Sequence, residues 1–135
     1  MASFVQIPTD TLTSYLEGMK FVPETVEGEL VYARPCKLDE RLKMVVYTSI
    51  KAGSDTVRGA GQDAVRVALT YDGRARRRGV KSNGRVNRVG TVDGVLARLK
   101  KRVIETALWT ADNLRRCPCG GLRYAGGRCL EEGCR

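Results

Sequence analysis

The stretch TVDGVLARLKKRVIETALWTADN, residues 91–113, is the strongest helix signal in the chain and decides the fold class. Thr91 can cap its start, and Asp93 lies in the first turn, where the helix dipole favours an acidic side chain. Its apolar residues keep helical spacing, which predicts one long amphipathic helix packed on the rest of the fold. The opposite face carries the charged residues Arg98, Lys101, Arg102 and Glu105, with Lys100 near its edge.

Three stretches before this helix predict β-strands because they are rich in β-branched and aromatic residues: 29–33, 43–50 and 63–71. In the third stretch, apolar residues that point to one side of the strand alternate strictly with a second set that points to the other side. This is the pattern of a sheet with one face on the core. The apolar set is Val65, Val67, Leu69 and Tyr71; the other is Ala64, Arg66, Ala68 and Thr70.

A short helix is predicted near the N-terminus, since a cap-like start at residues 7–10 is followed by an apolar stripe at helical spacing, Leu12, Tyr15, Leu16 and Met19. The expected fold class is therefore α+β, with an antiparallel sheet of about three to five strands packed by one long helix. Residues 1–116 would form this domain, and residues 117–135 a C-terminal zinc knuckle.

The net charge of +9 is concentrated in the middle of the chain. Residues 1–50 carry a net charge of −2, residues 51–116 of +10 and residues 117–135 of +1. A basic region on an otherwise near-neutral protein is typical of a polyanion binder, and nucleic acid is the commonest polyanion. The alternative is a solvated surface that serves solubility.

Seven positive charges and no negative ones lie within residues 74–88. The run Ser82-Asn83-Gly84 in this segment is a turn signal, because Asn-Gly suits a type I′ hairpin. The segment could be a flexible arm or a basic β-hairpin, and in either form it is suited to phosphate contact. Its cations are Arg74, Arg76, Arg77, Arg78, Lys81, Arg85 and Arg88.

Four of the five cysteines cluster near the C-terminus at metal-ligand spacing: Cys117, Cys119, Cys129 and Cys134. Glycine pairs at 120–121 and 126–127 permit the tight turns that direct backbone amides at sulfur. In a chain without secretory features, such cysteines are more often zinc ligands than disulfides or free thiols, which are the alternatives. Cys36 stands apart and is expected to be a bystander.

The run Cys117-Pro118-Cys119-Gly120-Gly121 resembles a zinc-ribbon knuckle, although its first cysteine pair is one residue shorter than the family pattern. Four thiolates would fill the coordination sphere of Zn²⁺ and leave no position for a catalytic water. The expected zinc is therefore a closed structural site.

No enzyme activity is expected, because the chain has no histidine and no Gly-x-x-x-x-Gly-Lys-[Ser/Thr] phosphate loop. A metal-dependent nuclease is an alternative that would need Asp63 and Asp72 to converge with Lys81. Caps and turns are the commoner roles of such isolated carboxylates.

Most of residues 43–114 resembles the core of Rad52-type single-strand annealing proteins, in the order of elements, the glycine-rich segment 58–64 and the basic long helix. The resemblance implies an oligomeric ring that lays single-stranded DNA in a groove between sheet and helix during recombination or repair. It implies phosphate contacts by Arg58, Arg66 and the 74–88 cations, with Lys100, Lys101 and Arg102 as helical partners.

Base stacking would need aromatic side chains, for which Tyr47, Tyr71, Trp109 and Tyr124 are candidates. Trp109 and Tyr71 have a competing role in the core. An RNA- or ribosome-associated zinc protein would share the basic segment and the knuckle, and is the other functional alternative.

The chain carries neither an apolar stretch of about 18 residues nor the basic start and apolar run of a signal peptide. We therefore expect a soluble protein of the cytoplasm.

Overall fold

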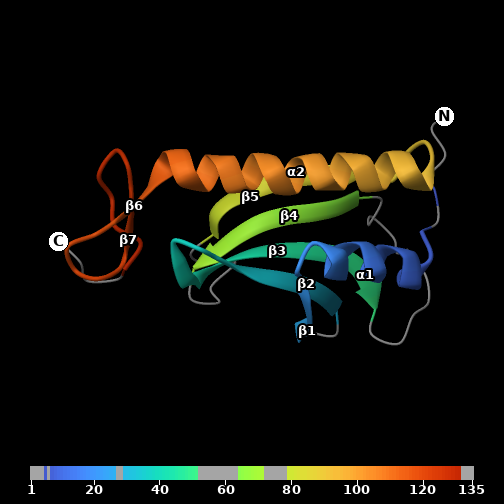
Figure 1. Cartoon of the computed structure of the whole chain (residues 1–135), viewed down its shortest axis with the longest axis horizontal. Coiled ribbons are helices and arrows are strands. Elements are labelled where there is room, and N and C mark those ends of the chain that lie inside the picture. The colour runs from blue at the N-terminus through green and yellow to red at the C-terminus, as the bar shows by residue number, and fades with distance from the viewer. Residues whose placement is uncertain (1–4, 6, 27–28, 52–63, 72–78, 132–135) are drawn as a thin grey trace.

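The computed structural model describes residues 5, 7–26, 29–51, 64–71 and 79–131. Within them, the chain forms a five-stranded antiparallel sheet, two helices on one of its faces, and a small C-terminal hairpin (Figure 1). This is the predicted α+β architecture of a sheet packed by one long helix. None of the helices in these residues is long and apolar enough to cross a membrane.

The five strands follow one another in space in chain order, each antiparallel to the next. The third and fourth strands pair without a shift of register, as where Val46 faces Val67, whereas the register shifts twice between the second and third strands and twice between the fourth and fifth. The strands are β1 (Val22–Val26), β2 (Glu29–Cys36), β3 (Asp39–Lys51), β4 (Ala64–Tyr71) and β5 (Gly79–Asn87).

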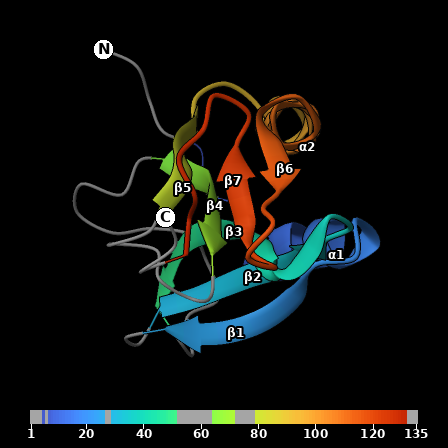
Figure 2. The ribbon, with the colours of Figure 1, turned by 90° about the vertical axis from the view of Figure 1, so that its left-hand side faces the viewer.

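Both helices cover the same face of the sheet, as Figure 2 shows. Leu16 of α1 (Thr9–Gly18) and Leu99 of α2 (Val92–Asn113) belong to one core cluster with Val46 and Val67 of the sheet. The alternation predicted for residues 63–71 is confirmed, since Val65, Val67, Leu69 and Tyr71 are all buried in this cluster and Arg66 is exposed.

The long helix α2 begins where its sequence predicts, because the Thr91 hydroxyl accepts a hydrogen bond from the amide of Gly94 at 3.0 Å. Its apolar stripe, with Val95, Leu99 and Val103, packs on β4 and β5. Its charged side faces outward, as expected.

The turn that Ser82-Asn83-Gly84 favours does not form, because these residues lie inside the continuous strand β5. Gly84 pairs with Val67 of β4, so a long-range strand partner overrides the local turn preference. Strand β1 was not predicted, and it contains Pro23. Proline is tolerated on an edge strand such as β1, where its missing N–H faces away from the sheet.

The C-terminal segment packs onto the rest of the fold. Strand β6 (Leu114–Arg116) continues directly from α2 and pairs with β7 (Leu122–Tyr124). Leu114, Leu122 and Leu130 lie in the same core cluster as the sheet and helices. The predicted division at residue 116 thus separates the two strands of one hairpin.

Candidate metal centre and nucleic-acid interface

Cys117, Cys119 and Cys129 converge at the end of the molecule where α2 stops. Their sulfur atoms lie within 4.8 Å of one another, and those of Cys119 and Cys129 are 3.6 Å apart. Three thiol groups this close can hold a soft metal ion. The fourth predicted ligand, Cys134, lies outside the described residues.

The backbone around the cluster has the tight turns that the glycines predict. The amide of Gly120 donates to the carbonyl of Cys117 at 2.9 Å, and the amide of Cys117 donates to the carbonyl of Gly121 at 2.9 Å. Gly120 has a φ of 94°, in the left-handed region that favours glycine. The amide of Glu131 points at the sulfur of Cys129 at 3.4 Å, a contact that would stabilise a thiolate.

A minimal hairpin joins the cysteines. The amide of Tyr124 donates to Arg128 at 2.8 Å, and that of Leu130 donates to Leu122 at 2.8 Å. Gly127 turns this hairpin with a φ of 135°.

Cys36 lies on β2, packed against the main core and apart from the cluster. Burial raises the pKa of its thiol. Among the described residues, neither it nor any of the three clustered cysteines forms a disulfide.

A charged network ties the cysteine segment to the sheet. Asp39, at the start of β3, accepts bonds from Arg41 at 2.8 Å and from Arg116 at 2.7 Å, and its side chain is only 6% exposed. Hydrogen bonds from Arg41 are the main reason why the pKa of Asp39 lies well below its usual range. Arg41 also donates to Glu131 at 2.8 Å and to the carbonyl of Gly120 at 2.9 Å.

Tyr71 completes this connection from β4. Its hydroxyl donates to the carboxylate of Glu131, and the guanidinium of Arg41 lies 5.2 Å from the centre of its ring. Burial, together with Glu131, raises the pKa of Tyr71. Tyr71 is therefore engaged in the core and is removed from the stacking candidates.

A second set of site residues lies on the sheet face opposite the helices. Tyr47, Arg66 and Arg85 occupy facing positions on β3, β4 and β5, so that they form a row across three strands. The guanidinium of Arg66 lies 5.2 Å from the centre of the Tyr47 ring. Arg66 and Arg85 are exposed, and the Nε of Arg85 donates to the Asn87 side chain at 3.0 Å. We call these three residues the sheet-face row.

The prediction that Arg88 contacts nucleic acid is corrected by its burial, since it is only 3% exposed. Its guanidinium donates to the carbonyl of Val5 at 3.0 Å, and its own carbonyl accepts from the Val5 amide at 2.7 Å. Arg88 therefore fastens the N-terminal segment to the end of β5.

The helix cations lie on α2, which covers the sheet face opposite the sheet-face row. Arg98 reaches the end of β5, where it donates to the carbonyls of Asn87 and Val89. It thus contacts the residue whose side chain accepts from Arg85. Arg102 pairs with Glu105 at 3.5 Å, and Lys100 and Lys101 are exposed on the outward side of α2.

Several residues predicted to contact nucleic acid have side chains that the structure does not describe. Lys81 lies in β5 opposite Leu69, with its side chain outside the described set. The remaining sequence candidates lie outside the described residues altogether: Arg58, Arg74, Arg76, Arg77 and Arg78, together with the nuclease candidates Asp63 and Asp72.

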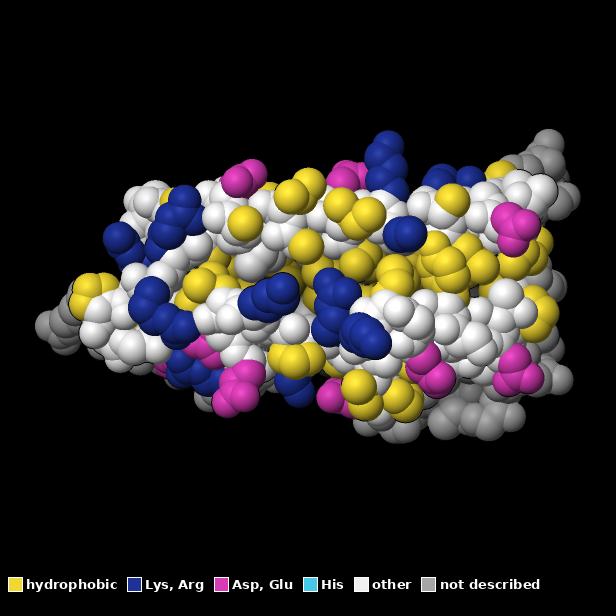
Figure 3. All heavy atoms as spheres, viewed as in Figure 1, with side chains coloured by type: hydrophobic (Ala, Val, Ile, Leu, Met, Phe, Trp, Pro, Cys, Tyr) yellow, Lys and Arg dark blue, Asp and Glu magenta, His cyan; other side chains and the backbone are white. Residues whose placement is uncertain are grey.

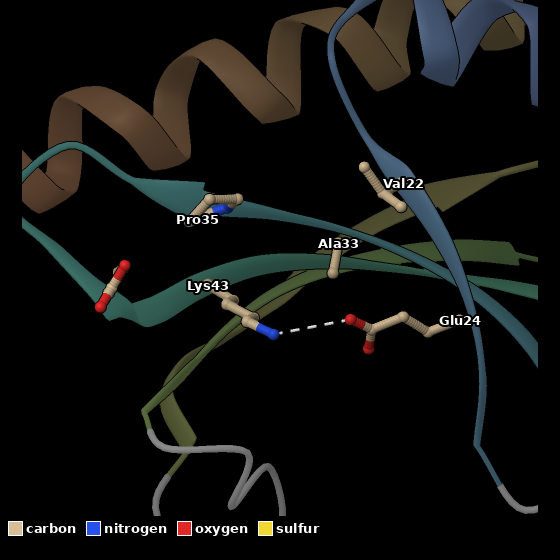
Figure 4. Close-up of a pocket in the computed structure, with 6 residues that line it drawn as sticks. Val22, Glu24, Ala33, Pro35 and Lys43 are labelled. Atoms are coloured by element: carbon tan, nitrogen blue, oxygen red, sulfur yellow. Dashed lines mark ion pairs between the residues drawn. The ribbon is translucent and has the colours of Figure 1, made fainter.

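A shallow pocket of about 430 Å³ lies at the β1 side of the sheet (Figure 4). In it the ammonium of Lys43 and the carboxylate of Glu24 point toward each other and pair at 3.5 Å. Because these charges offset each other, the pocket adds no net positive potential to the sheet-face row. Its lining is Val22, Glu24, Ala33, Pro35, Glu40 and Lys43.

Comparison with protein-family models, curated proteins and solved structures found no match for this chain. The resemblance to Rad52-type proteins thus gains no support from known relatives and stays a prediction. The function has to be argued from the sheet-face row and the cysteine cluster.

Proposed function

We propose that the chain binds single-stranded nucleic acid without base specificity, through the sheet-face row. The juxtaposition of Tyr47, Arg66 and Arg85 on three neighbouring strands is the observation that carries this proposal. Single-strand binders combine cations that follow the phosphate backbone with aromatic or arginine platforms on which bases stack. The Arg66–Tyr47 pair supplies such a platform, with Arg85 one strand farther along.

The placement of the two arginines favours an anionic ligand. Arg66 and Arg85 face each other across β4 and β5, so that one phosphate could accept hydrogen bonds from both guanidinium groups. Arginine also matches phosphate geometry with paired hydrogen bonds.

An unpaired strand suits this surface better than a duplex does. Stacking on Tyr47 or Arg66 requires an accessible base face, and a duplex hides the faces of its bases. Single-stranded DNA is the preferred ligand, and annealing of strands in recombination or repair is the activity such binding would serve. RNA also offers phosphates and accessible base faces, and it is therefore compared with DNA in the test below.

We also propose that the metal at the cysteine cluster is zinc and that Cys134 is its fourth ligand. The support is the donor set, three close thiols on glycine turns, and the spacing of Cys134 after Cys129. Bound zinc would fix the hairpin of residues 117–131 and perform no reaction, because four sulfur ligands leave no open position.

Binding to labelled strands of about 30 nucleotides, longer than the sites of known single-strand binders, tests the proposed ligand. Fluorescence anisotropy is compared for single-stranded DNA, duplex DNA and RNA at about 50 mM and about 200 mM salt. We expect single-stranded DNA to bind at least about tenfold tighter than duplex. If about four phosphates are contacted, its affinity should fall by about 50-fold between the two salt concentrations.

Duplex binding as tight as single-strand binding would contradict the proposal. Tighter binding of RNA than of single-stranded DNA would instead favour the RNA-associated alternative.

A further inference from the structure

The outward side of α2 carries a seam that the proposed function does not use. Ala97, Lys101, Ile104, Leu108 and Ala111 follow one another at spacings of four, three, four and three residues. This is the heptad spacing by which one helix packs against another. We call these five residues the α2 seam.

The α2 seam is turned away from the core. Val95, Leu99 and Val103 point to the sheet, whereas Ile104 is 50% exposed and Leu108 is 61% exposed. Figure 3 shows hydrophobic side chains alternating with charged ones along this helix. Large apolar side chains that are exposed at heptad spacing, on a helix already packed on its other side, are typical of an interaction surface.

We propose that the α2 seam pairs antiparallel with the same seam of a second copy of this chain. In such a pair centred between Ile104 and Leu108, each Ile104 packs against Leu108 of the other copy. Lys101 then lies beside Asp112 of the other copy, and the two-fold symmetry makes this ion pair twice. Lys101 and Asp112 are both exposed on the outward side of α2.

The charges select this arrangement over a parallel one. In a parallel pair, Lys101 would face Lys101 and Asp112 would face Asp112, so both contacts would be repulsive. A second copy in antiparallel orientation satisfies both the apolar and the charged residues.

The contact is short. The seam spans residues 97–111, a rise of about 21 Å along the helix, so the interface falls at the low end of protein contacts. We expect a dissociation constant on the order of 10 to 100 μM. Because the α2 seam and the sheet-face row lie on opposite sides of the molecule, the dimer would leave the row accessible and does not depend on the proposed function.

Sedimentation equilibrium of the metal-loaded full chain, freed of nucleic acid by nuclease and high salt, tests the pairing. The mass should rise with concentration from 14.9 kDa for one chain toward twice that value. Leu108→Glu should weaken the dimer by about tenfold or more. Val22→Glu, at another exposed apolar residue that is 58% exposed on β1, is the matched control and should leave it unchanged.

A charge swap keeps the test independent of folding. Lys101→Glu and Asp112→Lys should each weaken the dimer, since each places like charges together, and the double variant should restore it. A monomer at all concentrations up to about 1 mM overturns the proposal, as does a double variant that is weaker than either single variant. Binding of the monomeric chain to vesicles of anionic phospholipid would overturn it in favour of a membrane surface.

Discussion

Removal of the metal that we propose at the cysteine cluster is expected to unfold residues 117–131 while the five-stranded sheet stays folded. The segment is held by the short strand β7, a few apolar anchors and the contacts of Arg41 and Tyr71 with Glu131, so thiolate–metal bonds should supply most of its ordering energy. Apparent binding of structural zinc in small modules amounts to about 10 kcal/mol, more than a segment of this size gains by itself. Hydrogen exchange before and after chelation measures the effect: amides of 117–131 should lose protection, and those of β3 and β4 should keep it.

The matched variants are Cys129→Ser and Cys36→Ala. The first removes a cluster sulfur, and metal analysis should then find less than one bound ion per chain. The second removes a thiol outside the cluster and should retain one ion per chain. We expect Cys129→Ser to weaken nucleic-acid binding without abolishing it. Unchanged protection of residues 117–131 after chelation would refute the structural role of the metal.

Asp39→Asn is expected to lower the free energy of unfolding by about 2 kcal/mol. The substitution removes the charge that Arg41 and Arg116 share and so releases Arg116 of β6 from the sheet. Hydrogen bonds to a charged, buried acceptor contribute about 1.5 to 3 kcal/mol to stability. We expect a value below the top of that range, because the side chains of Arg116 and Arg41 are 51% and 39% exposed to solvent. Urea unfolding at neutral pH gives the value. Glu24→Gln, which breaks an exposed pair with Lys43, should cost less than about 0.5 kcal/mol.

The difference in stability between wild type and Asp39→Asn should depend on pH. Folding lowers the pKa of Asp39, so its contribution is present above the unfolded pKa of about 4 and is lost as the pH falls toward the folded value. The stability gap between wild type and Asp39→Asn should therefore be full at pH 7 and shrink below about pH 4. Taking the difference between the two chains removes the effect of acid on the metal, which both share. An equal gap at pH 7 and pH 3 would show that the charge of Asp39 is not what stabilises the fold.

Local patterns predicted the elements whose signals are complete within a few residues. The capped periodicity of 91–113 and the alternation of 63–71 reappear as α2 and β4, and the spacing of Cys117, Cys119 and Cys129 reappears as a cluster. In each case neighbours along the chain supply the physical cause, whether a helix face, a strand face or a chelating turn.

The sequence did not predict the features that depend on partners far apart in the chain. Strand β5 forms because β4 lies beside it, against the turn preference of Asn83-Gly84. The contact of Arg41 with Glu131 joins residues 90 positions apart, and no spacing rule connects them. The burial of Arg88 under the N-terminal segment was missed for the same reason, since a cation in a basic run reads as solvated until its partner is known.

Nucleic acid is proposed to bind the sheet face and not the outward side of α2, and two matched double variants decide between these surfaces. Arg66→Ala with Arg85→Ala removes two charges from the sheet-face row, while Lys100→Ala with Arg102→Ala removes two from the helix. Anisotropy with a labelled single strand of about 30 nucleotides compares them at equal net charge. We predict that the first pair lowers the affinity at least about tenfold. It should also make the plot of log affinity against log salt concentration shallower by about 1.4 in slope. The affinity of the second pair should stay within about twofold of wild type. An equal or larger loss from the helix pair would contradict the proposed site.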